Sequence, residues 1–366
     1  MKEVLVRLGN RSYPILVSPG ILDRAGGEIA ARVGAERLFV VTDEHVDSLY
    51  GPRVSRSLRR AGFRVHRFVM KPGEARKSLA TIRRVYDALA AAGADRSTAV
   101  VALGGGVVGD AAGFAAATWH RGIPLVQIPT TLLAQVDSSV GGKTGVNLPS
   151  GKNLVGAFHQ PALVLADPDC LRTLADREYA SGLGEVVKYG MIRDEPFFRR
   201  LERHSAAVLA RDPEEMGRVV ERCCLRKAEY VVADELDLSG RRAHLNYGHT
   251  FGHAVESATG YRRYRHGEAV ALGMTAASRV SVLLGDLAGE ERERLVGLLR
   301  FFRLPTSGVP VRPADLLARF RKDKKSRSGR VRIVLTKGIG SAIVSESVPR
   351  PLLLRGLREI CAPLRG

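Results

Sequence analysis

Residues 97–119 place an apolar run, a cluster of glycines and a second apolar run directly one after another. The first run, STAVVAL, is typical of a buried strand, and the second, DAAGFAAATW, is typical of a helix packed on a sheet. A strand that passes through a glycine loop into a helix is the repeating unit of a parallel sheet. This segment therefore indicates an α/β fold.

The rest of the first half repeats the same alternation of strand and helix. Apolar runs predict further strands at 38–43, 63–70, 124–131 and 162–168. Helices are expected near 52–61 and 78–92, and the chain starts with strand-like alternation of apolar and polar residues. We predict an α/β N-terminal, Rossmann-like domain with a mainly parallel sheet over residues 1–175.

The second half changes to helical patterns. Asp194 followed by Pro196 is a good helix start, because a capping side chain precedes an early proline. Further helices are expected near 213–233, 247–259, 267–284 and 289–302, with a β-hairpin over 330–347. We predict a mainly α-helical C-terminal domain over residues 176–366.

The glycine cluster of the first segment satisfies GxGxxG from Gly104 to Gly109 and continues into Asp110. Between a strand and a helix, this pattern predicts a dinucleotide pyrophosphate at the helix N-terminus. The acidic residue expected about 20 residues further on is missing, so we expect Asp43, Glu74 and Lys77 to help hold the nucleotide. The alternative is that the glycines only permit tight packing of helix on sheet.

Polar residues stand among small ones in the stretch that follows. Asp137, Lys143, Asn147, Lys152 and Asn153 lie in AQVDSSVGGKTGVN and PSGKNLVGAFHQP. Small residues let a ligand approach the backbone, and two ammonium groups suit an anion. The stretch therefore predicts an anion site, with a solvated loop as the alternative.

Two histidines, His249 and His253, are four apart in a helical run, and His266 follows before another apolar helix. This spacing is typical of half a metal site or of polar residues that line a helix interface. Glu185 and Lys188, in SGLGEVVKYGMI, share one face of a predicted helix among apolar neighbours. A surface ion pair is the alternative, but a buried carboxylate needs a partner or a metal. Glu185, His249 and His266 together predict a catalytic zinc site with open positions.

The net charge of +19, from 57 basic and 38 acidic residues, raises the possibility of nucleic-acid binding. The arginines are scattered among acids without an aromatic basic strip, so we expect no nucleic-acid partner. Lysine is rare here, and its ammonium is not interchangeable with the arginine fork. Lysines near the motifs above are therefore site candidates: Lys77, Lys143, Lys152, Lys188, Lys227, Lys324 and Lys325.

The location of the protein is predicted from what the sequence lacks. The 366-residue chain has no apolar run long enough to cross a bilayer and no signal-like start. Its four cysteines, Cys170, Cys223, Cys224 and Cys361, show no CxxC spacing. We expect a cytoplasmic protein with no membrane partner.

The motifs together resemble one enzyme family, that of 3-dehydroquinate synthase, a member of the sugar-phosphate cyclase superfamily. The matching segments are GGGVVGD, IPTTLLAQVDSSVGGKTGVN, GKNLVGAFHQP, GLGEVVKYG, LNYGHTFGHAVE and HGEAVALGM. The resemblance covers practically the whole chain and implies the dehydroquinate synthase-like fold. It also implies bound NAD, a Zn²⁺ or Co²⁺ ion and a homodimer.

The resemblance assigns roles to residues by motif position. It implies metal ligands Glu185, His249 and His266. It implies NAD contacts from Glu74, Lys77, Gly106, Val107, Val108, Gly109, Asp110, Thr130, Thr131, Lys143, Lys152, Cys170, Leu171, Arg172 and Thr173. Catalytic roles fall to Lys143, Lys188, Lys227, Arg242, Asn246 and His253. Substrate binding falls to Asp137, Lys152, Asn153, one of Lys324 and Lys325, and Arg121, which would reach the phosphate of the neighbouring subunit.

The implied reaction is redox-neutral conversion of 3-deoxy-D-arabino-heptulosonate 7-phosphate to 3-dehydroquinate and phosphate, a lyase step of the shikimate pathway. The substrate carries a carboxylate and a phosphate, which accounts for the cluster of Lys, Arg and Asn. Trp119-His120 before Arg121 departs from the family pattern. Two alternatives remain: another sugar-phosphate cyclase, and a metal-dependent alcohol dehydrogenase of the same fold.

Overall fold

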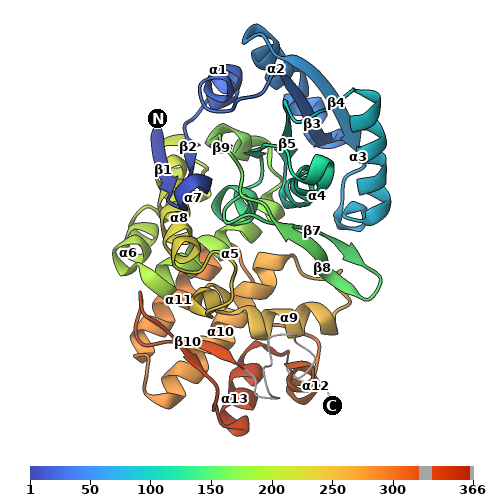
Figure 1. The fold of residues 1–366 in the computed structure, drawn as a ribbon. Coiled ribbons are helices and arrows are strands. Elements are labelled where there is room, and N and C mark those ends of the chain that lie inside the picture. Colours follow the sequence, from blue (N-terminus) through green and yellow to red (C-terminus); the bar gives the residue numbers. More distant parts are fainter. Residues whose placement is uncertain (321–331, 363–366) are drawn as a thin grey trace. The chain divides into compact units, whose positions relative to one another are not determined.

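The computed structural model describes residues 1–320 and 332–362, which form two compact units (Figure 1). The first unit comprises Met1–Leu174 with Pro213–Leu236, and the second comprises Ala175–Asp212 with Asp237–Gly366. The first division falls beside the expected boundary at residue 175. Pro213–Leu236 lies with the first unit, whereas the expected boundary places it in the second. Most of this segment is one helix that packs within the first unit.

The first unit is built on a seven-stranded sheet in the order β1-β2-β9-β6-β5-β3-β4 (Figure 1). Its strands are β1 (Lys2–Val6), β2 (Tyr13–Val17), β3 (Arg37–Asp43), β4 (Arg64–Met70), β5 (Thr98–Gly104), β6 (Leu125–Pro129) and β9 (Leu163–Ala166). β1 and β2 pair antiparallel, and all other neighbours pair parallel. The predicted, mainly parallel sheet is confirmed.

Helices cover both faces of this sheet, as the uninterrupted apolar strands require. Along β5, Ala99 and Val101 belong to a core that includes residues of α1 (Ala25–Ala30) and α2 (Glu44–Arg60). Val100 of the same strand points to the opposite core. That second core includes residues of α3 (Leu79–Ala91) and α4 (Gly106–Thr118).

A hairpin occupies the polar stretch that the sequence left without secondary structure. β7 (Lys143–Leu148) and β8 (Gly151–Phe158) pair antiparallel and form a sheet of their own. β7 packs on α4, where a Cβ on Gly113 would lie 2.5 Å from Thr144 Cγ2. These two strands were not predicted from sequence, because the stretch is rich in glycine and glycine is uncommon in strand interiors.

One long helix of the C-terminal half, α8 (Pro213–Ala233), belongs to the first unit. Its Lys227 binds the Asp137 side chain, and its Cys224 Sγ donates to Gln135 O at 3.2 Å. Lys2 on β1 forms an ion pair with Glu221 of α8. The helix was correctly predicted over 213–233, but its packing partner was not, since sequence spacing does not show which surface an amphipathic face meets.

The second unit is mainly helical, as predicted. Its helices are α5 (Asp176–Arg193), α6 (Glu195–Arg203), α7 (Ser205–Leu209), α9 (His249–Ala258), α10 (His266–Leu284), α11 (Gly289–Phe301), α12 (Pro313–Arg319) and α13 (Arg350–Ile360). Asp194 caps α6 by accepting from Phe197 N at 3.1 Å, as the Asp194–Pro196 spacing predicted. The predicted hairpin is present as β10 (Ile333–Thr336) and β11 (Ala342–Ser345). No sequence pattern predicted α7, α12 or α13.

α10 is the central helix of the second unit. It contacts α5, α9, α11 and α13, and most of its residues from Gly267 to Ser281 are buried. Its length and composition would suffice to cross a membrane, but 72% of its most apolar window is buried inside the protein. Its apolar character is accounted for by burial on all sides.

Candidate metal centre and nucleotide loop

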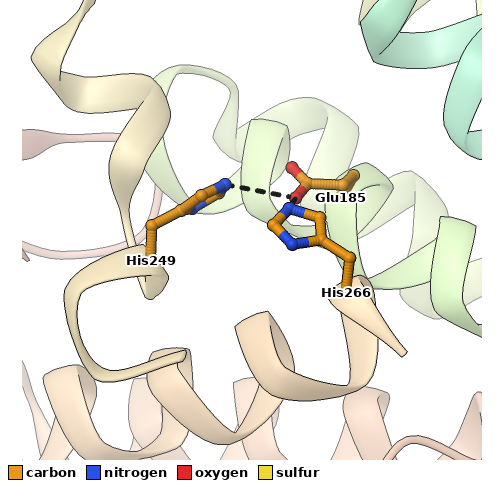
Figure 2. A group of neighbouring side chains, drawn as sticks. All are labelled: Glu185, His249 and His266. Atoms are coloured by element: carbon orange, nitrogen blue, oxygen red, sulfur yellow. Dashed lines mark ion pairs between the residues drawn. The ribbon is translucent and has the colours of Figure 1, made fainter. Parts of the chain in front are cut away.

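Glu185, His249 and His266 converge in the second unit from three different helices (Figure 2). Glu185 lies in the middle of α5, and the two histidines are the first residues of α9 and α10. Nε2 of His249 lies 3.4 Å from Glu185 Oε1, and Nε2 of His266 lies 3.3 Å from the same oxygen. The three residues predicted as metal ligands are therefore neighbours, with both imidazoles facing one carboxylate oxygen.

Glycines beside these residues allow the helices that carry them to touch. Gly267, next to His266, packs against α5 so closely that an added Cβ would lie 1.7 Å from Ser181 O. Gly184, next to Glu185, would place a Cβ 2.6 Å from the Gly267 carbonyl. The Ser181 hydroxyl accepts a hydrogen bond from Gly267 N at 3.0 Å. Only glycine permits this backbone contact, which sets the distance between Glu185 and His266.

Close contacts between glycines and backbone also join α9 to α10. A Cβ on Gly273 of α10 would lie 1.8 Å from Gly248 O, just before His249. Gly248 itself has φ 79°, a left-handed conformation that glycine adopts without strain. One turn further on, a Cβ on Gly252 would lie 2.8 Å from Ala269 O. The glycines in LNYGHTFGH and HGEAVALGM are a sequence signal for this packing that was not predicted.

An ion pair fixes the start of α10 against α5. Arg177 binds both carboxylate oxygens of Glu268, at 2.6 and 2.8 Å. Glu268 also accepts from Arg265 N at 2.7 Å, which satisfies a free N–H at the helix start. The bidentate geometry restrains the turn on which His266 stands.

The electrostatics around Glu185 favour a cation. Its side chain is fully buried, with Lys188 Nζ against Oε2 and the imidazoles near Oε1. Burial opposes ionisation, but Lys188 and the two imidazoles hold the pKa of Glu185 well below its ordinary value. Burial likewise lowers the pKa of His249, which stays neutral despite the attraction of Glu185.

His266 shows the opposite shift. Burial would lower its pKa, but hydrogen bonds to Glu185 and Glu256 raise the pKa of His266 to about 10. A positive charge is therefore favoured between the two carboxylates. A divalent cation bound there would replace this proton, since metal ligands must be deprotonated.

These donors fit a first-row divalent metal ion. The group offers one carboxylate oxygen and two imidazole nitrogens, which all lie within 4.8 Å of one another. Three N and O ligands with a position left open are typical of catalytic zinc, and cobalt accepts the same set. His253 shares the face of α9 with His249, as predicted, but belongs to a second group with Glu256 and His266.

The other predicted residues of the second unit lie near the N-terminus of α9 or on α5. Lys188, on α5, is 1% exposed, and the predicted surface alternative for the Glu185–Lys188 pair is therefore wrong. Arg242 is buried in a short 3-10 turn, Arg241–Asn246, that leads to α9. Asn246 ends that turn and is half-buried. Lys324 and Lys325 lie outside the described residues.

The glycine loop of the first unit connects β5 to α4 as predicted. Gly104 ends the strand, Gly105 precedes the helix, and α4 begins at Gly106. An added Cβ on Gly105 would lie 3.0 Å from Thr131 Cγ2, and one on Gly106 would lie 3.1 Å from Ser138 Oγ. Among the described residues no side chain caps this helix, which leaves its N-terminus suited to an anion.

Charged residues from neighbouring segments line the first turns of α4. Lys77 Nζ lies 2.5 Å from Asp110 Oδ2, and Lys77 is 5% exposed. Burial raises the pKa of Asp110 against the opposing pull of Lys77. Glu74 accepts from Asn147 Nδ2 at 2.7 Å, which ties its loop to β7.

Thr130 and Thr131, predicted to contact the nucleotide, follow β6. Thr130 N donates to Gly104 O at 3.0 Å, so this turn lies directly beside the glycine loop. Val107 and Val108 lie in the first turn of α4, and Val108 is packed in the core. Asp43 lies at the end of β3, where its side chain caps α2 by accepting from Val46 N at 3.0 Å.

The polar stretch presents its side chains from a turn and a hairpin. Lys227 of α8 donates to Asp137 O at 2.6 Å and also binds the Asp137 carboxylate. Asn153 adopts φ 52°, and its N–H donates to Asn147 Oδ1 at 3.0 Å. Lys143 starts β7, and Lys152 is on β8.

The two remaining predicted segments lie at turns. Cys170, Leu171, Arg172 and Thr173 form a 3-10 turn after β9, in which the Cys170 thiol is buried in the core. Arg121 is exposed after α4, with φ 66°. His120 before it has φ 48°, so His120 and Arg121 form a left-handed turn directly after Trp119.

Comparisons with known proteins identify the family. Residues 67–181 match the model of the 3-dehydroquinate synthase N-terminal domain, and residues 182–326 match that of its C-terminal domain. A 3-dehydroquinate synthase from Halorhodospira halophila is 51% identical over 96% of this chain and 98% of its own length.

Solved structures of sister enzymes share the fold. A 2-epi-5-epi-valiolone synthase from Streptomyces hygroscopicus subsp. jinggangensis, with NAD⁺ and Zn²⁺ bound, is 32% identical, with a TM-score of 0.87 over 98% of this chain and 97% of that one. A 2-deoxy-scyllo-inosose synthase, complexed with carbaglucose-6-phosphate, NAD⁺ and Co²⁺, is 26% identical, with a TM-score of 0.88 over 98% of this chain and 100% of that one. The two family models and the full-length relatives show that this chain belongs to the 3-dehydroquinate synthase family.

Proposed function

We propose that this protein is a 3-dehydroquinate synthase that uses NAD and a divalent metal ion, Zn²⁺ or Co²⁺. It converts 3-deoxy-D-arabino-heptulosonate 7-phosphate to 3-dehydroquinate and inorganic phosphate, a lyase reaction without net oxidation. The convergence of Glu185, His249 and His266 on one buried oxygen is the observation that carries the proposal. The family membership and the matching relatives support it.

The metal ligands in this proposal are Glu185, His249 and His266. When bound, the ion supplies Lewis-acid stabilisation of negative charge that develops on a substrate oxygen. Lys188 lies against the second oxygen of Glu185, so it fixes the carboxylate and leaves Oε1 to face the imidazoles. The glycine contacts of α10 hold the ligands at this spacing before any ion binds.

The nucleotide in this proposal is bound by the loop from Gly104 to Asp110 and by the segments beside it. NAD bound there would supply reversible hydride transfer, which fits a reaction without net oxidation. The backbone N–H groups at the start of α4 suit its pyrophosphate. Thr130 and Thr131 adjoin this loop, and Lys77 holds Asp110 at its side.

The substrate brings two anionic groups, and the proposal assigns cationic and amide side chains to them. In the first unit these are Lys143, Lys152, Asn153 and Lys227, with Asp137 holding the last of them in place. In the second unit they are Lys188, Arg242 and Asn246, and the proposal assigns a catalytic role in proton transfer to His253. Lysine and arginine neutralise phosphate and carboxylate charge as it develops, and amides orient the hydroxyl groups.

A second candidate function is that of a sister cyclase acting on another sugar phosphate. The similarity of fold to the valiolone and inosose synthases favours it. The identity of 51% to a 3-dehydroquinate synthase, against 32% and 26% to those enzymes, makes 3-dehydroquinate synthase the preferred proposal. A homodimer, in which Arg121 reaches the neighbouring subunit, and a cytoplasmic location are also part of the proposal.

The decisive experiment follows phosphate and reduced nicotinamide in the same reaction. With the seven-carbon substrate and catalytic amounts of NAD, we expect one phosphate per substrate consumed and no lasting gain of NADH. Accumulation of NADH in step with substrate loss, without phosphate, would identify an alcohol dehydrogenase instead. Faster turnover of a sugar phosphate without a carboxylate than of the seven-carbon keto-acid phosphate would identify a sister cyclase.

A further inference from the structure

In both imidazoles of the metal centre Nε2 faces Glu185, but Nδ1 contacts a different kind of group in each ring. Nδ1 of His249 lies 3.1 Å from the backbone carbonyl oxygen of Tyr247. Nδ1 of His266 lies 3.5 Å from the side-chain oxygen Oε1 of Glu256. Nε2 of each ring faces Glu185. One ring is therefore oriented by the main chain and the other by a carboxylate.

The outer group decides which nitrogen can bind a metal. A neutral imidazole carries a single N–H, and its other nitrogen has the free lone pair. An acceptor at Nδ1 keeps the hydrogen there and leaves Nε2 free to coordinate. Glu256 is 7% exposed, so water competes little with its contact to His266.

Glu256 belongs to a second group of potential ligands with His253 and His266, all within 4.8 Å of one another. Both groups share His266, through Nε2 in one and Nδ1 in the other. A neutral ring has one free lone pair, so as a neutral imidazole His266 can serve as a ligand in only one of the two groups. Glu256 therefore fits the role of acceptor, and the second group is not a separate metal site.

The helix α9 explains how Glu256 reaches this position. Glu256 follows His249 by seven residues, so two helical turns place both on one face of α9. α10 packs along that helix and brings His266 to it. Thus α9 supplies one ligand directly and controls the orientation of another ligand on α10.

We propose that Glu256 is a positioning residue of the metal centre: its carboxylate accepts the Nδ1–H of His266 and so presents Nε2 of His266 to the metal. This inference rests on the proposed metal-dependent function. Carboxylates in this outer position contribute roughly 10–100-fold to metal affinity in other proteins.

The test uses the full-length protein, stripped of metal with a chelator and titrated with Co²⁺. Glu256→Met removes the acceptor at similar length, and Glu256→Gln keeps an oxygen but removes the charge. We expect Co²⁺ affinity to fall about 10–100-fold for the Met variant and less for Gln, with an altered Co²⁺ visible spectrum. Glu215→Gln is the matched control, because Glu215 is also buried but pairs with Arg218 in the first unit.

Co²⁺ affinity within twofold of wild type in both Glu256 variants would overturn the inference. Wild-type protein that fails to bind Co²⁺ at all would instead refute the metal-dependent function itself. If the variants do not fold, ¹⁵N-histidine NMR of the wild-type protein loaded with Zn²⁺ decides the question. A proton on Nδ1 of His266 is expected, and a His266 ring protonated on Nε2 would contradict the proposal.

Discussion

Glycines lie beside both candidate ligand sites, but their neighbours are side chains in the first unit and helix backbone in the second. In the glycine loop of the first unit, a Cβ on Gly105 or Gly106 would meet the side-chain atoms of Thr131 or Ser138 at 3.0–3.1 Å. Around α10 of the second unit, a Cβ on Gly267 or Gly273 would overlap backbone oxygens at 1.7–1.8 Å. Side chains can move and packed helix backbones cannot. The first set leaves room for a ligand, and the second set determines where the metal ligands lie.

The two regions also hold carboxylates with opposite pKa shifts, one partly exposed and one fully buried. Burial raises the pKa of Asp110, which has Lys77 as its close cation. Burial acts in the same direction on Glu185, but Lys188 and two histidines together lower its pKa. For Asp110 the effect of burial outweighs the attraction of nearby lysines, whereas for Glu185 Lys188, His249 and His266 together outweigh burial.

The largest effect is expected from Gly267→Ala. The new methyl group cannot avoid Ser181 O without separating α10 from α5, so we expect a loss of about 3 kcal/mol or more in the free energy of unfolding. Urea unfolding and Co²⁺ titration measure the two consequences. Gly297→Ala in α11 is the control, since nothing lies within 4 Å of its Cβ position. It should stabilise by about 0.5–1 kcal/mol, and equal stability of both variants would remove the distinction between the two kinds of glycine.

His249→Ala should abolish metal binding while the second unit stays folded. Turnover should fall by at least about a thousandfold, because Lewis-acid stabilisation contributes several kcal/mol. Metal analysis of the purified variant tests the loss of metal, and circular dichroism tests whether the helical fold is retained. His204→Ala, at a histidine outside both ligand groups, should keep its metal. Full zinc occupancy in the His249 variant would remove this residue from the site.

Lys77→Met should leave Asp110 without its ammonium partner. We expect a loss of about 2 kcal/mol near pH 7, below the roughly 3–5 kcal/mol for a fully buried pair, because a fifth of the Asp110 side chain is exposed. The folded-state pKa of Asp110 lies above its unfolded value of 3.8, so the folded state binds more protons and the free energy of unfolding falls as pH rises through that interval.

Without Lys77 the pKa of Asp110 should rise further, so the penalty should shrink as pH is lowered toward 4. Urea unfolding of both proteins at a series of pH values measures this difference. When Lys77→Met is made in the Asp110→Asn background, its effect relative to the Asp110→Asn single variant should lose its pH dependence. A penalty that is the same at every pH would show that Asp110 does not carry it.

Lys152→Arg should reduce kcat/KM by about tenfold or more despite the retained charge, because the planar guanidinium needs a different geometry from an ammonium. Steady-state kinetics with the seven-carbon substrate tests this expectation. Lys71→Arg is the matched control, since Lys71 is exposed and pairs with Glu44 at 2.8 Å. Near-normal kinetics for Lys152→Arg would show that this lysine is incidental.

The smallest effect is expected from Gly105→Ala. The methyl group meets only Thr131 Cγ2, so stability should change by less than about 1 kcal/mol. NAD affinity should fall about tenfold, which corresponds to 1.4 kcal/mol, and calorimetric titration with NAD measures it. The double variant Gly105→Ala/Thr131→Ser removes the colliding methyl and should recover part of the affinity. A large loss of stability in Gly105→Ala would place this glycine with those of α10.

Much of the fold could be predicted from sequence because its signals are local. The apolar run of β5, the glycines before α4 and the Asp194 cap of α6 each act within a few residues. The hairpin β7–β8 was missed because its glycines weaken the strand signal. The membership of α8 in the first unit was missed because it depends on which surface its apolar face meets.

For the metal centre, the sequence by itself determined the donor types: the His249–His253 spacing, His266 before an apolar helix and Glu185 among apolar neighbours. Only the tertiary structure decided which donors meet. His253 shares its helical face with His249, yet it lies with Glu256 rather than with Glu185. Helical spacing fixes a direction around one axis, whereas the meeting of three helices depends on how closely their backbones approach. That approach is set by the contacts of Gly267 and Gly273, between residues far apart in the chain.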